Sequence, residues 1–168
     1  MRRILLTCTL AFTLLPVFGG EGKAPPMDKE KSLLIDYVDP FIGTTNFGTT
    51  NPGAVCPNGM MSVVPFNVMG SADNTYDKDA RWWSTPYEHT NCFFTGYSHV
   101  NLSGVGCPEL GSLLLMPTTG ELNVDYKEYG SKYKDEQASP GYYSNYLTKY
   151  NIKTEVSATP RTGIARFT

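Results

Sequence analysis

The sequence predicts an all-β protein, and in particular an antiparallel β-sandwich. Turn-forming residues occur along the whole chain, since 16 Gly and 12 Pro are found among 168 residues. Tyr (11) and Phe (8) are abundant, whereas charged residues make up only 18% of the chain, and this balance favours strands over a helix bundle. No segment keeps a helical repeat of about 3.6 residues for long enough to predict an amphipathic helix.

The first residues have the layout of a secretory signal peptide. Arg2 and Arg3 precede an uncharged and mostly apolar run, Ile4–Phe18, and small residues follow it. The run is shorter than the ~20 residues that a membrane-spanning helix needs. We therefore expect residues 1–20 to be a signal peptide and 21–32 to be a linker. The mature protein is expected in the periplasm, on the bacterial cell surface or secreted, without a stable membrane span.

Residues 33–168 are predicted to form the sandwich domain. Leu33–Val38 is a short apolar segment that Asp39-Pro40 ends, and the composition of Gly43–Gly53 is typical of a loop. Strands are predicted at Met60–Phe66, Phe93–Val100, Ser112–Met116 and Leu122–Tyr126, with a turn at Pro117–Gly120.

The clearest strand pattern lies near the end of the chain. Ile152, Thr154 and Val156 alternate with three polar residues, and this period of two places one row inward and the other outward. A strand at Tyr143–Tyr150 is predicted to precede it. Ile164–Thr168 begins another strand and stops without a turn, so we expect the sandwich domain to be the front part of something longer.

The overall composition excludes two broad classes of function. The formal net charge is -2 and the sequence pI is about 5.6, so the chain lacks the basic character of a nucleic-acid-binding protein. A hydrophobic content of 40% is too high for a disordered tail.

Cysteine usage leaves the redox state open. Cys8 lies in the predicted signal peptide, so Cys56, Cys92 and Cys107 remain in the exported chain, and an odd number cannot all pair. One disulfide with a free thiol and no disulfide at all are both compatible with the sequence. Cys92 and Cys107 flank a predicted strand and loop and are the better candidates for a pair.

Three familiar kinds of chemical site find little support. A zinc site from two histidines and two cysteines lacks closely paired ligands, and the acidic loop Asp73–Asp79 lacks the glycine of a calcium loop. Ser98 beside His99 lacks the G-x-S-x-G frame of a hydrolase nucleophile. We assign no catalytic residue and no metal ligand in this chain.

Two segments could contact a sugar. Trp82 and Trp83 follow a polar loop, where an indole can stack on the apolar face of a sugar ring, although at least one of them is expected in the core. The loop Gly43–Gly48 is rich in glycine and hydroxyl groups, so its backbone could approach a ligand closely. An ordinary connecting loop is the alternative.

Five strings in a fixed order carry a family resemblance. They are Tyr37–Thr44 (YVDPFIGT), Asn51–Met60 (NPGAVCPNGM), Gly96–Pro108 (GYSHVNLSGVGCP, continued by Met116–Gly120), Ser139–Tyr143 (SPGYY) and Ala158–Gly163 (ATPRTG). In this order and spacing, residues from about Leu34 to Thr168 closely resemble the N-terminal region of the glycoside hydrolase family 92 α-mannosidases.

The resemblance implies an exported bacterial exo-α-mannosidase that trims mannose from N-glycans and mannans. It further implies a β-sandwich packed on an (α/α)6 barrel, an inverting mechanism and a requirement for calcium. The family's acid, base and calcium ligands belong to the barrel, which this sequence does not reach. The expected partners are therefore a mannose-containing glycan and the missing C-terminal barrel domain.

The resemblance also implies substrate-binding residues in the sandwich. Thr45, Asn46 and Phe47 match the family loop that borders the mannose site, and Trp83 is the choice for a sugar-contacting aromatic. His99 lies in the family's Ser-His string, where a structural hydrogen-bonding histidine is an equal alternative.

Two hypotheses follow from the sequence. Departures from the family pattern, such as Asn58 in the second string and Asn101 where many members have a histidine, leave linkage specificity open. The first hypothesis is the N-terminal part of a secreted α-mannosidase, which forms one wall of the mannose pocket. The alternative is a stand-alone carbohydrate-binding or adhesion sandwich without catalysis.

Overall fold

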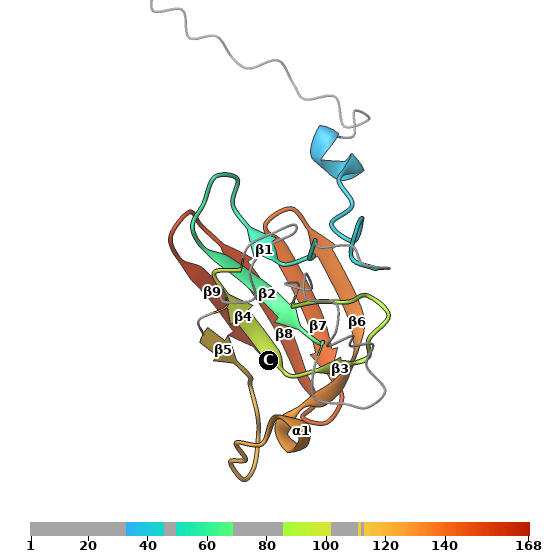
Figure 1. Cartoon of the computed structure of the whole chain (residues 1–168), viewed down its shortest axis with the longest axis vertical. Coiled ribbons are helices and arrows are strands. Elements are labelled where there is room, and N and C mark those ends of the chain that lie inside the picture. The colour runs from blue at the N-terminus through green and yellow to red at the C-terminus, as the bar shows by residue number, and fades with distance from the viewer. Residues whose placement is uncertain (1–32, 46–49, 69–85, 102–110, 112) are drawn as a thin grey trace, which may run out of the picture. The chain divides into compact units, whose positions relative to one another are not determined.

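The computed structural model describes residues 33–45, 50–68, 86–101, 111 and 113–168, which all belong to one compact unit, Leu33–Thr168. Their strands form two antiparallel sheets that face each other (Figure 1). The first sheet has the order β1 (Ala54–Val55), β2 (Ser62–Phe66), β4 (Gly96–His99), β5 (Leu113–Leu115). The second has the order β3 (Phe93–Phe94), β6 (Ser131–Ser139), β7 (Tyr142–Leu147), β8 (Ile152–Ala158), β9 (Gly163–Phe167). The predicted all-β sandwich is confirmed.

Two short helical turns accompany the sheets. Leu34–Tyr37 forms a 3-10 turn, η1, within the apolar segment that precedes the first loop, and all its residues are exposed. Tyr126–Tyr129 forms α1, whose first turn is capped by the Asp125 carboxylate accepting from the Lys127 amide at 3.0 Å. In the described ranges no helix is long and apolar enough to cross a membrane.

The alternation in β8 is confirmed. Ile152, Thr154 and Val156 are buried, whereas Lys153 and Ser157 are exposed and Glu155 is half-buried. Inward side chains of a strand with period two pack against the opposite sheet, and this row lies in the core between the sheets.

The predicted strand Phe93–Val100 is divided between the two sheets. Phe93 and Phe94 pair with β6, whereas Gly96–His99 pairs with β2 and β5. Gly96 has φ +146 at the crossing, and a Cβ there would lie 2.9 Å from the Leu115 carbonyl oxygen. Only glycine fits this conformation and this close approach, so the chain changes sheets here.

The strand β6 was not predicted from the sequence, because a β-bulge breaks its alternation. The pairing with β7 shifts between Lys134 and Gln137, and Asp135 has a left-handed φ of 53°. The extra residue moves Glu136 and Ala138 to the inner side of the strand together with Tyr133. A charged sequence with an interrupted period of two gives little strand signal.

The predicted strand Leu122–Tyr126 is wrong. Leu122 and Val124 are 80% and 85% exposed and belong to an irregular segment that leads into α1. The Asn123 side chain accepts from the Asp125 amide at 2.8 Å, a local hydrogen bond that competes with strand pairing. Other strand bounds differ by a few residues, and β7 ends at Leu147 because a turn containing Asn151 at φ +54 follows.

The core between the sheets combines apolar packing with a buried polar array. The hydrophobic core consists of Ala54, Val63, Phe94, Tyr97, Tyr143, Leu147, Ile152 and Val156. Tyr97 from β4 reaches across to the second sheet, where its hydroxyl lies 2.5 Å from Thr154 Oγ1 and 3.3 Å from Asn145 Oδ1. Thr154 in turn donates to Asn145 Oδ1 at 2.5 Å. These contacts satisfy polar atoms that are cut off from water.

Replacing Tyr97 by Phe tests the contribution of this array. The variant keeps the ring and removes a hydroxyl with two buried partners, so we expect it to lower the free energy of unfolding by about 1–2 kcal/mol. Denaturant unfolding measures the change. Tyr146→Phe is the matched control, because its hydroxyl lies 3.5 Å from Asn151 at an exposed position, and a change within about 0.5 kcal/mol is expected. Equal losses in both variants would contradict the assignment.

Candidate functional site

The loop that begins at Gly43 is closed at its base by Thr50. The Thr50 amide donates to the Gly43 carbonyl at 3.3 Å, and the Thr50 hydroxyl donates to the Ile42 carbonyl at 2.7 Å. Gly43 has φ +79, and a Cβ there would lie 2.8 Å from Thr50 Oγ1. The glycine is therefore required by both the turn and the close contact, and the two ends of the loop are held together.

His89 lies against the first half of this loop. Its backbone amide donates to the Thr44 carbonyl at 2.9 Å, and its ring is 4.9 Å from the Phe41 ring between centroids. Thr44 is 1% exposed, and its hydroxyl donates to the Phe41 carbonyl at 2.7 Å. The segment 86–91 thus supports the loop through one backbone hydrogen bond and one aromatic contact.

The carboxylate of Glu136 joins this region to the sheet core. Tyr143 donates its hydroxyl to Glu136 Oε1 at 2.5 Å, and Tyr87 donates to the same atom at 2.8 Å. Tyr87 also lies 2.9 Å from His89 Nδ1, and Glu136 Oε2 is 3.7 Å from that nitrogen. The Glu136 side chain is 14% exposed and the His89 side chain 47%, so the cluster runs from the interior to the surface.

A second hydrogen-bonded array fixes the segment that carries His89. Asn67 donates to the Glu88 carbonyl at 2.9 Å and to the Tyr133 hydroxyl at 2.8 Å, and it accepts from the Glu88 amide at 2.8 Å. Tyr133 donates to the Asn91 carbonyl at 2.8 Å. The position of residues 86–91 is therefore set by a buried amide and a tyrosine of β6.

The predicted substrate-binding residues fall into two groups. Thr45 is half-buried at the base of the loop, directly after Thr44, and His99 is half-buried on β4, where its Nδ1 lies 3.1 Å from the Leu113 carbonyl. In the described ranges no hydrogen bond or ring contact joins Thr45 to His99. Asn46, Phe47 and Trp83 lie outside the described residues. Their substrate-binding roles stay predictions.

The structure adds two residues that the sequence did not single out for sugar binding. The sequence offers His89 only as a ligand of the disfavoured zinc site, and it indicates no role for Glu136. The closeness of His89 to the loop depends on pairings between segments far apart in the chain. Glu136 faces inward because of the bulge in β6. Neither the pairing between distant segments nor the bulge can be predicted from a single sequence.

Of the sites that the sequence disfavoured, the serine beside His99 has other contacts, whereas the loop Asp73–Asp79 lies outside the described residues. Ser98 donates to Asn101 Oδ1 at 3.1 Å, whereas the neighbouring His99 faces the Leu113 carbonyl. Within the described part of the chain, no group of three or more His, Cys, Asp or Glu residues could hold a metal ion. Cys56 and Cys92 are free thiols, and Cys107 lies outside the described residues.

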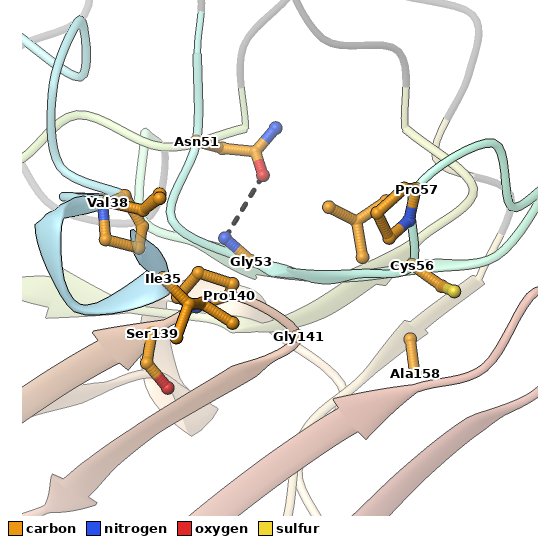
Figure 2. A pocket seen from close by; sticks show the side chains of 12 residues that line it. Ile35, Val38, Asn51, Gly53, Cys56, Pro57, Ser139, Pro140, Gly141 and Ala158 are labelled. Carbon is orange, nitrogen blue, oxygen red and sulfur yellow. Dashed lines mark hydrogen bonds between the residues drawn. The ribbon is translucent and has the colours of Figure 1, made fainter. Parts of the chain in front are cut away.

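An apolar cavity of about 540 Å³ has Pro40 and Asn51 in its lining, close in sequence to the two ends of the Gly43–Thr50 loop (Figure 2). Its lining includes Ile35, Val38 and Pro140, the last of which lies in the β6–β7 turn. Asn51 accepts from the Gly53 amide at 3.2 Å beside it. Its described lining holds no charged side chain, which does not suit a polyhydroxylated sugar, and it includes neither Thr45 nor His89.

The structure defines an antiparallel β-sandwich domain with a polar, aromatic loop site at one side. Residues 37–168 match the model of the glycosyl hydrolase family 92 N-terminal domain, and the chain belongs to this family. The resemblance in the sequence is thereby confirmed.

Solved structures support the same assignment. A family 92 α-mannosidase from Bacteroides thetaiotaomicron, also solved with mannoimidazole, is 34% identical with a TM-score of 0.67, over 79% of this chain and 18% of that one. Another family 92 glycosyl hydrolase is 28% identical with a TM-score of 0.61, over 79% of this chain and 18% of that one. An inverting family 92 mannosidase from the same Bacteroides species shares the fold. It is 24% identical with a TM-score of 0.58, over 80% of this chain and 18% of that one.

The match is thus confined to a small part of these relatives. The chain spans 18% of the length of each of the solved enzymes named above. Comparison with curated proteins gave no match.

Buried tyrosines make the domain sensitive to alkaline pH. Burial raises the pKa values of Tyr87, Tyr97, Tyr133 and Tyr143 well above 10, and the Glu136 carboxylate raises them further. Because the folded state keeps these protons, the stabilisation is complete below pH 10 and is lost as the pH rises above the unfolded pKa. Four such groups give a slope of roughly 5 kcal/mol per pH unit above pH 10.

Tyrosinate absorbance recorded together with circular dichroism measures this effect. Part of the tyrosinate signal is expected to form only as the domain unfolds, and a Tyr143→Phe variant should lose part of that late signal. Complete ionisation of all tyrosines near pH 10 in a folded domain would contradict the burial of these hydroxyls.

Proposed function

We propose that this chain is the N-terminal part of an exported, calcium-dependent, inverting exo-α-mannosidase that acts on N-glycans or mannans. The match of residues 37–168 to the family's N-terminal domain carries the proposal. The likeness to a solved α-mannosidase at 34% identity supports the choice of mannosides as substrate. In this proposal the sandwich supplies one wall of the mannose pocket.

The loop at Gly43–Thr50 supports the role as a pocket wall. Its base is held by Thr50 and by His89, so the backbone near Thr45 is fixed before any ligand arrives. Backbone and hydroxyl groups that are already held in place can bind sugar hydroxyls at a low cost in conformational entropy. Thr45, Asn46 and Phe47, with Trp83 and His99, are the residues proposed to contact mannose.

The chemistry proposed for the complete enzyme needs groups that are not assigned in this chain. Inversion requires a carboxylic acid that protonates the leaving oxygen and a carboxylate that activates water on the opposite face of the sugar. Calcium would be held by further oxygen ligands. As the resemblance to the family implies, we propose that the acid, the base and the calcium ligands lie in the barrel domain.

The coding sequence downstream of Thr168 tests the proposal directly. We expect an open frame of several hundred residues with a helical-repeat pattern and paired carboxylates. A genuine stop codon directly after Thr168 would overturn the proposal in favour of a non-catalytic carbohydrate-binding or adhesion domain.

Activity assays test where the catalytic groups lie. The 168-residue chain is expected to release no mannose from α-mannosides with or without calcium, because the acid and base are absent from it. The complete protein should release mannose, and a calcium chelator should abolish this release. Mannose release by the purified 168-residue chain above a mock preparation would refute the placement of the catalytic groups.

Export is tested by the N-terminus of the mature protein. We expect expression in a bacterial host to yield a protein in the periplasm or medium that has lost about the first 20 residues. Mass spectrometry of the intact protein measures the cleavage. Replacing Arg2 and Arg3 by Glu should reduce export, whereas the same change at the linker residues Lys29 and Lys31 should not.

A further inference from the structure

The positions of the hydrogen atoms around Glu136 follow from which groups can donate. A carboxylate oxygen only accepts, so Tyr143 and Tyr87 must both donate their hydroxyl hydrogens to Glu136 Oε1. A phenol has a single hydrogen to give. Once Tyr87 has donated to Glu136, its oxygen can only accept in the 2.9 Å contact with His89 Nδ1. Nδ1 of His89 must therefore carry a hydrogen.

The tautomer of His89 determines what its other nitrogen can do. A neutral imidazole has one donor nitrogen and one acceptor nitrogen, and the hydrogen bond at one nitrogen sets the role of the other. With the hydrogen on Nδ1, Nε2 of His89 is an acceptor. Nδ1 is engaged with Tyr87 beside the largely buried Glu136, while about half of the His89 side chain remains exposed.

The same residue is held in place on its other sides. Its backbone amide is bonded to the Thr44 carbonyl, and its ring lies against Phe41. The acceptor nitrogen is therefore carried by a residue in direct contact with the Phe41–Thr45 segment. The β6 bulge, which turns Glu136 inward, is what brings the carboxylate to this position.

We propose that Glu136 and Tyr87 are positioning residues that hold His89 with a hydrogen on Nδ1 against the Phe41–Thr45 segment, so that Nε2 of the neutral form can accept a hydrogen bond from a ligand hydroxyl. That this hydroxyl belongs to mannose rests on the proposed function. The tautomer and the positioning stand independently of it.

Nuclear magnetic resonance of the ring nitrogens in the full chain tests the tautomer. The sequence contains only two histidines, His89 and His99, so a His99→Gln variant assigns both signals. At about pH 8.5, where ordinary imidazoles are neutral, His89 is expected as the Nδ1–H tautomer. His99 is expected to be the same tautomer, because its Nδ1 faces a carbonyl oxygen, and it has no contact with Glu136. It is therefore an internal control.

Two pairs of variants test the positioning. Glu136→Gln and Tyr87→Phe should both move His89 toward a mixture of tautomers, and Glu136→Gln should speed hydrogen exchange of the His89 amide about tenfold. The matched controls, Glu155→Gln and Tyr142→Phe, break an equivalent hydroxyl–carboxylate bond of 2.9 Å in another part of the second sheet and should leave His89 unchanged. His99 should keep its tautomer in all four variants.

The outcomes are distinct. An Nε2–H tautomer of His89 in the native chain would overturn the proposal. The proposal would also be overturned if both Glu136→Gln and Tyr87→Phe left the tautomer and the amide exchange of His89 unchanged. An unchanged His99 signal would show that these variants are folded. Failure of the proposed function would instead appear as a lack of mannosidase activity in the complete protein, while His89 keeps the expected tautomer.

Discussion

The sandwich depends on burying large tyrosine rings while giving every buried hydroxyl a hydrogen-bond partner. Tyr97 and Tyr143 bring extensive apolar area into the space between the sheets, and an unpaired hydroxyl there would cancel much of that gain. Tyr97 of the first sheet meets Asn145 and Thr154 of the second. Apolar contacts alone tolerate sliding between sheets, whereas these directional bonds are satisfied in a single arrangement.

The same requirement connects the core with the loop site. Tyr143 is part of the core, and its hydroxyl is bonded to Glu136, which also accepts from Tyr87 beside His89. A carboxylate this close to the core is tolerated because two hydroxyl donors and a nearby imidazole surround it. The support of the Gly43–Thr50 loop is therefore continuous with the packing of the sandwich.

The proposed function gives the hydrogen-bonded base of the Gly43–Thr50 loop a role in the site. In that proposal the catalytic groups lie in another domain and the sandwich contributes by positioning, for which Gly43 and Thr50 hold the base of the loop in place. The apolar cavity beside Ile35 and Pro140 has no charged side chain in its described lining. The two features are therefore separate in their chemistry as well as in their lining residues.

The sequence by itself determined the fold class, the family and the simplest strands. The period of two in β8 and the glycine- and proline-rich turns report local geometry, and local geometry can be read from neighbouring residues. Leu122–Tyr126 failed as a strand because strand formation needs a partner, and the exposed Leu122 and Val124 have none in the described sheets.

Only the tertiary structure decided how the candidate site is built. The crossing at Gly96 and the bulge at Asp135 change which sheet or which face a residue joins. The contact of His89 with both Thr44 and Glu136 joins segments more than 40 residues apart. Such contacts arise from strand pairing and packing between distant segments, so no local sequence pattern predicts them.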